Sequence, residues 1–151
     1  MESLDRRNLF AAFSALATAG ALSAGARADA PTLTESKVLR YADLPVRKFP
    51  NGSEQRRVMA GTLATGEFLE VHETMMPAGQ SPHPSHAHPN SEIIFMQTGN
   101  AEYIDEHGTH IPVGPGDIFF SASNKLHGFV NTGTTAATYI VVSVSKQLPE
   151  G

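Results

Sequence analysis

The sequence predicts an all-β domain, and three features support this prediction. Short runs of apolar and polar residues alternate, turns rich in glycine and proline separate them at close intervals, and no helical period appears beyond the N-terminal region. Regular short strands of this kind pack as a sandwich or a barrel. The chain has 151 residues, 40% of them hydrophobic, which is enough for one domain with one core.

Composition excludes several classes of function. The chain has no cysteine, so it carries no disulfide, thiolate zinc site, iron–sulfur cluster or cysteine nucleophile. Its formal net charge is −4 and it lacks a cluster of lysine and arginine, so we expect no nucleic acid among its partners. Histidine is the unusual component: there are seven, and the functional interpretation depends on four of them.

Residues 1–28 are predicted to be a signal peptide. Arg6 and Arg7 precede an Ala-rich apolar stretch that ends in small residues, as in secretory signals. The stretch is shorter than the about 20 residues of a spanning helix, so we expect no membrane span in the mature chain. The two arginines resemble a twin-arginine (Tat) signal, from which Asp5 and the absence of a following lysine depart.

Cleavage is predicted after Ala28, because Pro31 would obstruct the alternative cut after Ala30. Removal of this segment implies a periplasmic or secreted protein, exported by the Tat or the general secretory route. An amphipathic N-terminal helix that stays attached is the alternative.

The remaining chain divides into a lead-in, residues 29–55, and a strand-rich domain, residues 56–148. Prolines and an Asn51-Gly52 turn favour irregular structure in the lead-in. In the domain, β-branched and aromatic residues alternate with polar ones between turn residues. The predicted strands are Arg57–Leu63, Glu67–Met75, Ser91–Thr98, Asn100–Ile104, Thr109–Val113, Asp117–Ser121, His127–Asn131 and Ala136–Val144.

Turn residues separate these strands in order. Glycine adopts positive φ without a steric penalty, and proline and asparagine favour turn backbone, so each such group ends a strand. The larger apolar residues between the turns are predicted to line the interior. The predicted turns include Thr65-Gly66, Pro77-Ala78-Gly79, Thr98-Gly99-Asn100, Glu106-His107-Gly108, Gly114-Pro115-Gly116 and Thr132-Gly133. The predicted lining residues are Met96, Phe119, Phe120, Phe129 and Tyr139.

Histidines are concentrated between Gly79 and Glu92. Side chains alternate faces along an extended chain, so His86 and His88 point to the same side. Glu92 follows an even number of positions later and faces that side too if Pro89-Asn90 only bends the chain. Two imidazoles and a carboxylate that converge bind a divalent metal and leave coordination positions open.

His127 offers a fourth ligand from a separate strand, on the face that it shares with Phe129 and Asn131. A histidine-rich loop that clusters by accident, with His127 as a core residue, is the alternative. Asp117 and Asn131 are predicted to be turn and capping residues.

These residues resemble the motifs of the cupin family. The first cupin motif is G-x5-H-x-H-x3,4-E-x6-G, which the chain matches with one additional residue after the first glycine. The second motif is resembled by Pro115-Gly116-Asp117 and by His127 to Asn131, with a longer segment between them. The residues that match the first motif are Gly79, His86, His88, Glu92 and Gly99.

The resemblance implies a cupin jelly-roll β-barrel, in which His86, His88, Glu92 and His127 are ligands of one divalent metal ion. It also implies a homodimer. A site of three histidines and one glutamate suits Fe, Mn, Ni, Zn or Cu, and the ligand types alone do not choose among them.

Cupins include oxygenases, decarboxylases and lyases, so the resemblance implies one of these activities on a small oxygen-rich organic substrate. Glu92 and His83 are the candidate catalytic residues, with Glu92 shifting or protonating during turnover and His83 as an outer-shell acid or base. An exposed loop position is the alternative for His83. A non-catalytic metal- or ligand-binding module and a role in self-association are the alternative functions.

The remaining histidines are expected outside the site. His72 and Glu73 occupy opposite faces of one strand, so at most one faces inward, and a position on the sheet surface is the default expectation. His107 and His110 lie on either side of a turn and are expected to be exposed.

Overall fold

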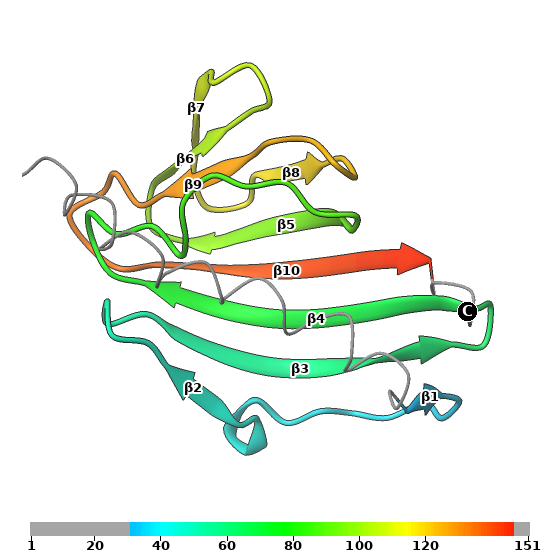
Figure 1. Ribbon diagram of the computed structural model, residues 1–151. Helices are drawn as coiled ribbons and strands as arrows, with labels where there is room; N and C mark the ends of the chain where they lie inside the picture. The colour runs from blue at the N-terminus through cyan, green and yellow to red at the C-terminus, as the bar shows by residue number, and fades with distance from the viewer. Residues whose placement is uncertain (1–30, 147–151) are drawn as a thin grey trace, which may run out of the picture. The chain divides into compact units, whose positions relative to one another are not determined.

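The computed structural model describes residues 31–146, and most of this region is β-structure in two sheets (Figure 1). The signal peptide predicted over residues 1–28 lies outside the described residues and stays a prediction. Within residues 31–146, no helix has the length and apolar character needed to cross a membrane.

The larger sheet has seven strands, and β1 and β3 form its parallel pair while its other pairs are antiparallel. In hydrogen-bonded order its strands are β1 (Thr32–Leu33), β3 (Glu54–Leu63), β4 (Glu67–Met76), β10 (Ala137–Lys146), β5 (Ser91–Thr98) and β8 (Ile118–Ser121), with β2 (Val46–Lys48) paired to β3.

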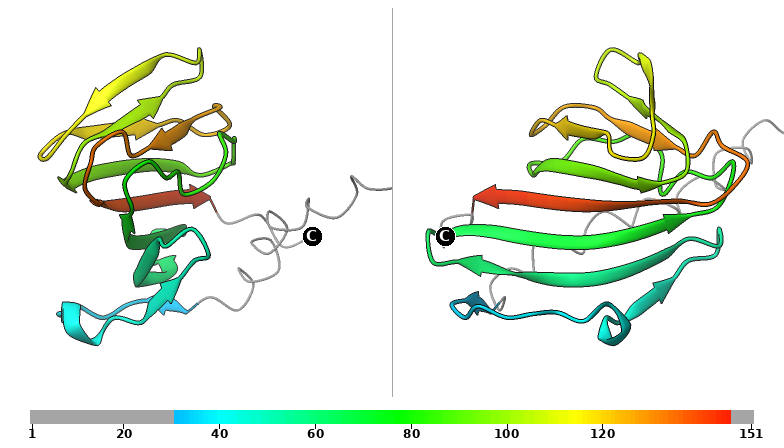
Figure 2. Two further views of the ribbon diagram at one scale, coloured as in Figure 1. Left: turned by 90° about the vertical axis from the view of Figure 1, so that its left-hand side faces the viewer. Right: turned by 180° about the vertical axis from the view of Figure 1, so that it is seen from behind.

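The smaller sheet has three antiparallel strands, and it lies beside β5 and β8, away from β1, in all views (Figures 1 and 2). Its order is β7 (His110–Val113), β6 (Ala101–Ile104) and β9 (Gly128–Val130). Among the described strands, no hydrogen-bonded pair joins the two sheets. The closed barrel that we predicted is therefore wrong: the outermost strands, β1 and β7, do not meet, and the sheets are held together by side-chain packing.

The strands predicted from residue 57 onward are confirmed, with ends shifted by up to three residues. Two short strands and a 3-10 turn, η2 (Tyr41–Asp43), lie in the lead-in, where we expected irregular structure. β2 fits between Pro45 and Pro50, which flank it without removing a hydrogen bond from the sheet. Its pairing with β3, where Arg47 lies opposite Gln55, brings the lead-in to the domain.

The core lies between the sheets and includes three of the residues predicted to line it, Met96, Phe129 and Tyr139. Phe119 packs against this core, but Phe120 is 60% exposed, so the prediction for Phe120 is wrong. Neighbouring residues of a strand face opposite sides, and in β8 it is Phe119 that faces inward.

Buried Asn131 fastens the loop that carries the histidines. Its side-chain amide donates hydrogen bonds to the carbonyl oxygens of Met76 and Thr135, both at 2.9 Å, and its Oδ1 accepts one from the backbone N–H of Gly133. The backbone N–H of Gly79 donates to the carbonyl oxygen of Asn131 at 2.9 Å. This confirms the turn role predicted for Asn131 and fixes the start of the histidine loop.

Candidate metal centre

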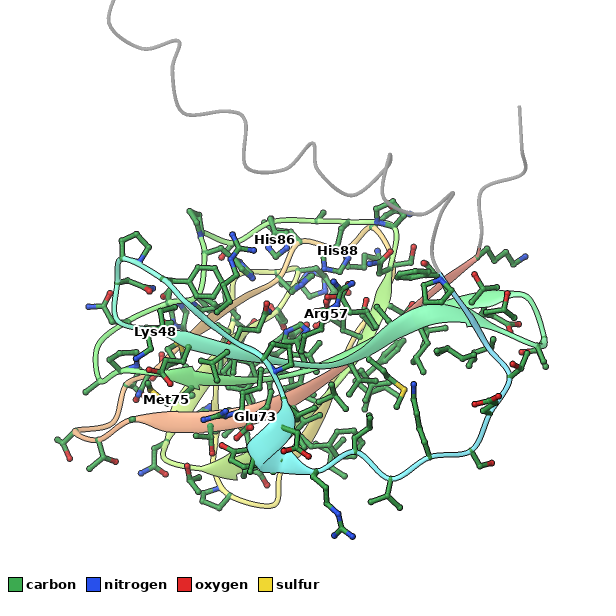
Figure 3. The ribbon with its side chains drawn as sticks, turned by 90° about the horizontal axis from the view of Figure 1, so that it is seen from below. Lys48, Arg57, Glu73, Met75, His86 and His88 are labelled. Atoms are coloured by element: carbon green, nitrogen blue, oxygen red, sulfur yellow. The ribbon has the colours of Figure 1, made fainter. Side chains whose placement is uncertain are left out.

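Three histidines from two distant segments meet at one point. His86 and His127 form an isolated antiparallel bridge, in which each backbone N–H donates to the other's carbonyl oxygen at 2.9 Å. The ring centroid of His88 lies 5.0 Å from that of His86 and 4.9 Å from that of His127. One ligand nitrogen from each ring lies within 4.8 Å of the others, so a single ion can reach all three (Figure 3 labels His86 and His88).

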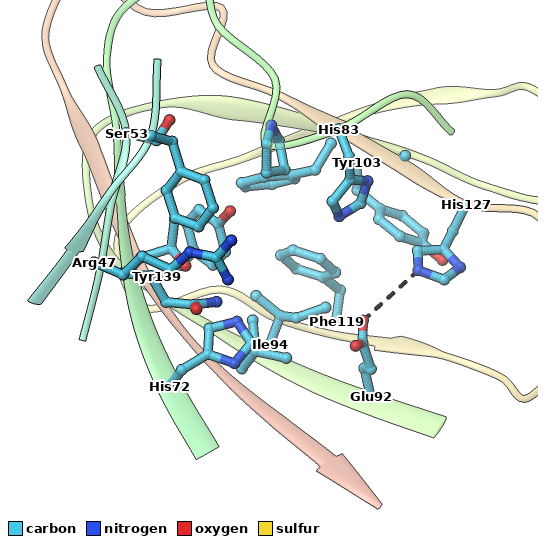
Figure 4. Close-up of a pocket in the computed structure, with 17 residues that line it drawn as sticks. Arg47, Ser53, His72, His83, Glu92, Ile94, Tyr103, Phe119, His127 and Tyr139 are labelled. Carbon is cyan, nitrogen blue, oxygen red and sulfur yellow. Dashed lines mark ion pairs between the residues drawn. The ribbon is translucent and has the colours of Figure 1, made fainter. Parts of the chain in front are cut away.

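Glu92 adds a carboxylate next to two of the three histidines. It is the second residue of β5, and its Oε1 lies 3.4 Å from Nε2 of His88. Its Oε2 lies 3.6 Å from Nε2 of His127 (Figure 4). The structure thus brings together the four residues predicted as ligands, with the three imidazoles as the closest group.

Backbone carbonyls orient two of the rings. Nδ1 of His88 donates to the carbonyl oxygen of Asn90 at 3.1 Å, and Nδ1 of His127 donates to that of Lys125 at 2.9 Å. In both rings Nε2 then lies on the side of Glu92, and a histidine whose other nitrogen donates to a backbone carbonyl is typical of metal sites.

Within this cluster, two buried imidazole nitrogens have no hydrogen-bond partner among the described residues, Nδ1 of His86 and Nε2 of His127. A buried polar atom without a partner is unfavourable. A divalent cation accepts a nitrogen lone pair, and nitrogen and carboxylate ligands suit transition metals. The donor set and these two atoms therefore fit a metal ion.

The charges of the site also favour a cation. Burial, together with the neighbouring His83, His127 and His88, lowers the pKa of His86 to about 4, so this imidazole is neutral at pH 7. Burial would raise the pKa of Glu92, but His127 and His88 outweigh it and hold this pKa well below its usual range. Glu92 in turn raises the pKa of His127, against the effect of burial.

A cavity of about 300 Å³ opens beside Glu92 and His127 (Figure 4). Figure 4 shows Arg47, Ser53 and His72 on the side opposite these two residues. Apolar and aromatic side chains from both sheets line the space between the two sides. They are Ile94, Tyr103, Phe119, Phe129, Tyr139 and Val141.

The candidate His83 lies at the rim of this cavity. Its ring centroid is 4.0 Å from that of His86, and its Nδ1 donates to the carbonyl oxygen of Pro84 at 3.1 Å. Burial lowers its pKa, against the effect of that hydrogen bond. His83 is an exposed loop residue, as the alternative expectation had it, and it lies beside one candidate ligand, where an outer-shell acid or base would lie.

Sequence reasoning missed one side of the cavity. His72 faces inward from β4, on the same face as Thr74, and not outward as the default expectation had it. Its neighbour in space, Arg47, lies in the lead-in, where no strand was predicted. His107 and His110 are exposed, as predicted, and His110 pairs with Glu102 at 2.8 Å.

Two facing sheets with a cluster of candidate metal ligands beside a cavity are typical of the cupin fold, and solved structures agree. An RmlC-like cupin from Shewanella frigidimarina superposes with a TM-score of 0.63 at 17% identity, over 75% of this chain and 94% of that one. A predicted oxalate decarboxylase from Thermotoga maritima gives 0.59 at 22% identity, over 72% and 99%.

Residues 71–143 match the family model of the cupin domain, Cupin_2, in agreement with this fold. A curated relative, the dimethylsulfoniopropionate lyase DddQ of Ruegeria pomeroyi, is 38% identical over 61 residues. That match covers 40% of this chain and 30% of the lyase, so it spans less than a third of the relative's length.

Proposed function

We propose that this chain is a metal-dependent cupin enzyme that acts on a small oxygen-rich organic molecule. The observation that carries this proposal is the pair of buried nitrogens that form no hydrogen bond, His86 Nδ1 and His127 Nε2, in a cluster with His88 and Glu92 beside a cavity. The proposed ligands of one divalent ion (Fe, Mn, Ni, Zn or Cu) are His86, His88, Glu92 and His127.

When bound, such an ion supplies a Lewis acid or a redox centre. The residues of the chain exclude water from the site and transfer protons. The apolar lining, with Phe119 and Phe129, excludes water from the substrate. Because Nδ1 of His83 donates to Pro84, its Nε2 is free to accept a proton at the rim.

Among the three reaction types, a lyase is favoured. The curated relative with 38% identity over 61 residues is a lyase, although the match covers only part of it. A lyase needs a base beside the substrate, and His83 supplies a neutral imidazole at pH 7 because burial lowers its pKa. Glu92 is the second candidate for proton transfer.

The metal content of the purified protein tests this proposal first. We expect one equivalent of metal by inductively coupled plasma mass spectrometry, and its loss in His127→Ala. His110→Ala is the matched control, because this histidine is exposed and pairs with Glu102 away from the cluster. A His127→Ala protein that retains stoichiometric metal would refute the site.

Turnover is tested next on the metal-loaded protein, with a panel of small acids and enols and with oxygen uptake recorded in parallel. Loss of a substrate without oxygen uptake supports a lyase or decarboxylase, and oxygen uptake supports an oxygenase. Bound metal without any substrate loss would overturn the enzyme in favour of a metal- or ligand-binding module.

We further propose that the chain is exported to the periplasm or secreted, on the pattern of residues 1–28 alone. A folded Tat substrate can acquire its metal before export, away from periplasmic copper and zinc. Replacing Arg6 and Arg7 by lysine should abolish export by this route, and N-terminal sequencing should find Asp29 first. Unchanged export would argue against Tat, and an intact Met1 against cleavage.

We also propose a homodimer that covers the outer face of β5 and β8. This face carries a contiguous group of exposed apolar side chains in register, and such patches mark association sites. Phe120→Glu should shift the protein to monomer in analytical ultracentrifugation, while Val38→Glu, exposed in the lead-in, should not. A wild-type monomer would contradict the proposal. The group is Ile93 (38% exposed), Phe95 (37%), Ile118 (62%) and Phe120 (60%).

A further inference from the structure

Arg47 brings an uncompensated positive charge to the cavity. It lies in β2 and enters from the side opposite Glu92 and His127 (Figure 4). Its guanidinium carbon lies 4.7 Å from the centroid of the Phe49 ring, which supports the side chain from below. Among the described residues no carboxylate forms an ion pair with it, whereas the next residue, Lys48, pairs with Glu54 at 3.1 Å.

Two buried polar atoms that form no hydrogen bond lie on the same side of the cavity. Ser53 is 3% exposed, and its Oγ has no hydrogen-bond partner among the described residues. Nδ1 of His72 also forms no hydrogen bond there, and it lies 3.9 Å from Oε1 of Glu70. Gln55, which lies opposite Arg47 in the β2–β3 pair, also lines the cavity. Buried donors without partners are rare, and a ligand that accepts hydrogen bonds would satisfy them.

The balance of charge favours an anion. A divalent ion bound by three imidazole nitrogens and one carboxylate would leave its side of the cavity with a single positive charge, and Arg47 adds a second on the other side. Between them the lining is mostly apolar, and Arg47, an exposed residue of β2, keeps contact with solvent that partly screens its charge. A ligand with negative groups at both ends matches this distribution.

We propose that Arg47 and Ser53 form an anion subsite that holds a carboxylate of the substrate, across the cavity from the metal ligands. The planar guanidinium matches a carboxylate with two parallel hydrogen bonds. This subsite rests on the proposed function for its place in a reaction, and it narrows the substrate to a small carboxylic acid with a second oxygen function.

The cavity also limits the size of that acid. A volume of about 300 Å³ is at the lower end of the range for small-molecule pockets, so a small acid fits better than an oligomer. Cationic ligands are disfavoured by Arg47.

Calorimetry with malonate as the probe tests the subsite on the full chain, both metal-free and zinc-loaded. We expect malonate to bind in both states, and Arg47→Gln to weaken binding about tenfold in both without lowering the zinc content. Arg47→Lys should recover part of the affinity, because it keeps the charge but loses the planar fork. Ser53→Ala should weaken binding by a smaller factor.

Lys48→Gln is the matched control. It removes the same charge from the neighbouring position, where the side chain is 77% exposed and lies on the other face of the strand. The subsite is refuted by no malonate binding to metal-free wild type, by unchanged binding in Arg47→Gln, or by an equal loss in Lys48→Gln. If phosphate displaces malonate and binds at a lower concentration than malonate does, the proposed ligand group is a phosphate and not a carboxylate.

The subsite and the proposed enzyme can fail separately. If the protein binds malonate through Arg47 but binds no zinc, the anion subsite is supported and the metal enzyme is refuted. If the protein binds stoichiometric zinc and turns over neutral substrates equally well in Arg47→Gln, the metal enzyme is supported and the anion subsite is refuted.

Discussion

The two sides of the cavity are encoded in different ways. The side with the candidate metal ligands comes from the loop before β5, from β5 itself and from the residue before β9; His86, His88 and Glu92 follow one another at short spacing, and His127 joins them from a distant segment. The opposite side comes from β2, β3 and β4, and it depends on the pairing of Val46–Lys48 with the start of β3. Local alternation specifies three of the four residues on the first side, whereas long-range strand pairing assembles the second.

The largest loss of stability is expected from a substitution at a residue that packs against both sides of the cavity. Phe129 lies in the core between them, with its ring 4.8 Å from that of Tyr139 and 5.5 Å from that of Phe119. Phe129→Ala should lower the free energy of unfolding by about 3–5 kcal/mol. Urea denaturation measures this, and a loss below about 1 kcal/mol would show that the aromatic cluster does not hold the sheets together.

Substitution of the candidate metal ligands should abolish the stabilisation of the protein by zinc. Zinc at about a hundred times its dissociation constant should raise the unfolding free energy of the wild type by about 3 kcal/mol. In the double variant His86→Ala/His88→Ala this increase should vanish, whereas in His107→Ala it should persist. Thermal unfolding with and without zinc is the measurement, and an undiminished increase in the double variant would refute the site.

A substitution at Glu92 tests the contribution of its charge to metal binding without changing the shape of the side chain. Glu92→Gln keeps the shape but removes the carboxylate that lies 3.4 Å from His88. We expect zinc affinity to fall about 10–100-fold in a competition titration with a chelator. Unchanged affinity would mean that the three histidines alone bind the ion, in keeping with their closer grouping.

The metal-free protein should lose stability in acid through His86. Its pKa of about 4 is below the ordinary 6.5, so the unfolded chain binds the proton first as pH falls. Its contribution is fully present above pH 6.5 and is lost on descent to pH 4. Between pH 7 and 5 the free energy of unfolding, measured by urea denaturation, should fall more in wild type than in His86→Gln, by about 1 kcal/mol after allowance for solvent screening. An equal change in the free energy of unfolding of the two proteins between pH 7 and 5 would contradict this.

The smallest effect is expected at the hydrogen bond from Ser121 Oγ to the Tyr103 hydroxyl, 3.2 Å long, which links β8 to β6 across the interior. Ser121→Ala should cost about 1 kcal/mol in urea denaturation and leave the zinc content unchanged. A loss of zinc would show that this link also positions Glu92, its register partner in β5.

Much of the fold could be predicted, because turn residues and alternation mark each strand from residue 57 onward. Alternation states which residues share a face but not which face is buried. This is why Phe120 was assigned to the interior and His72 to the surface. Arg47 lies in a strand of three residues between prolines, too short for a periodic signal. The closed barrel failed for a related reason, since edge pairing depends on the curvature of whole sheets.

The backbone bridge between His86 and His127 has a practical consequence. Reciprocal hydrogen bonds, with no contribution from the imidazoles, hold the two donor segments together. The folded chain should therefore release its ion to a chelator and accept another without refolding. The side chains at positions 86, 88 and 127 could therefore be substituted without loss of the backbone bridge, and a site with a different metal preference could be engineered there.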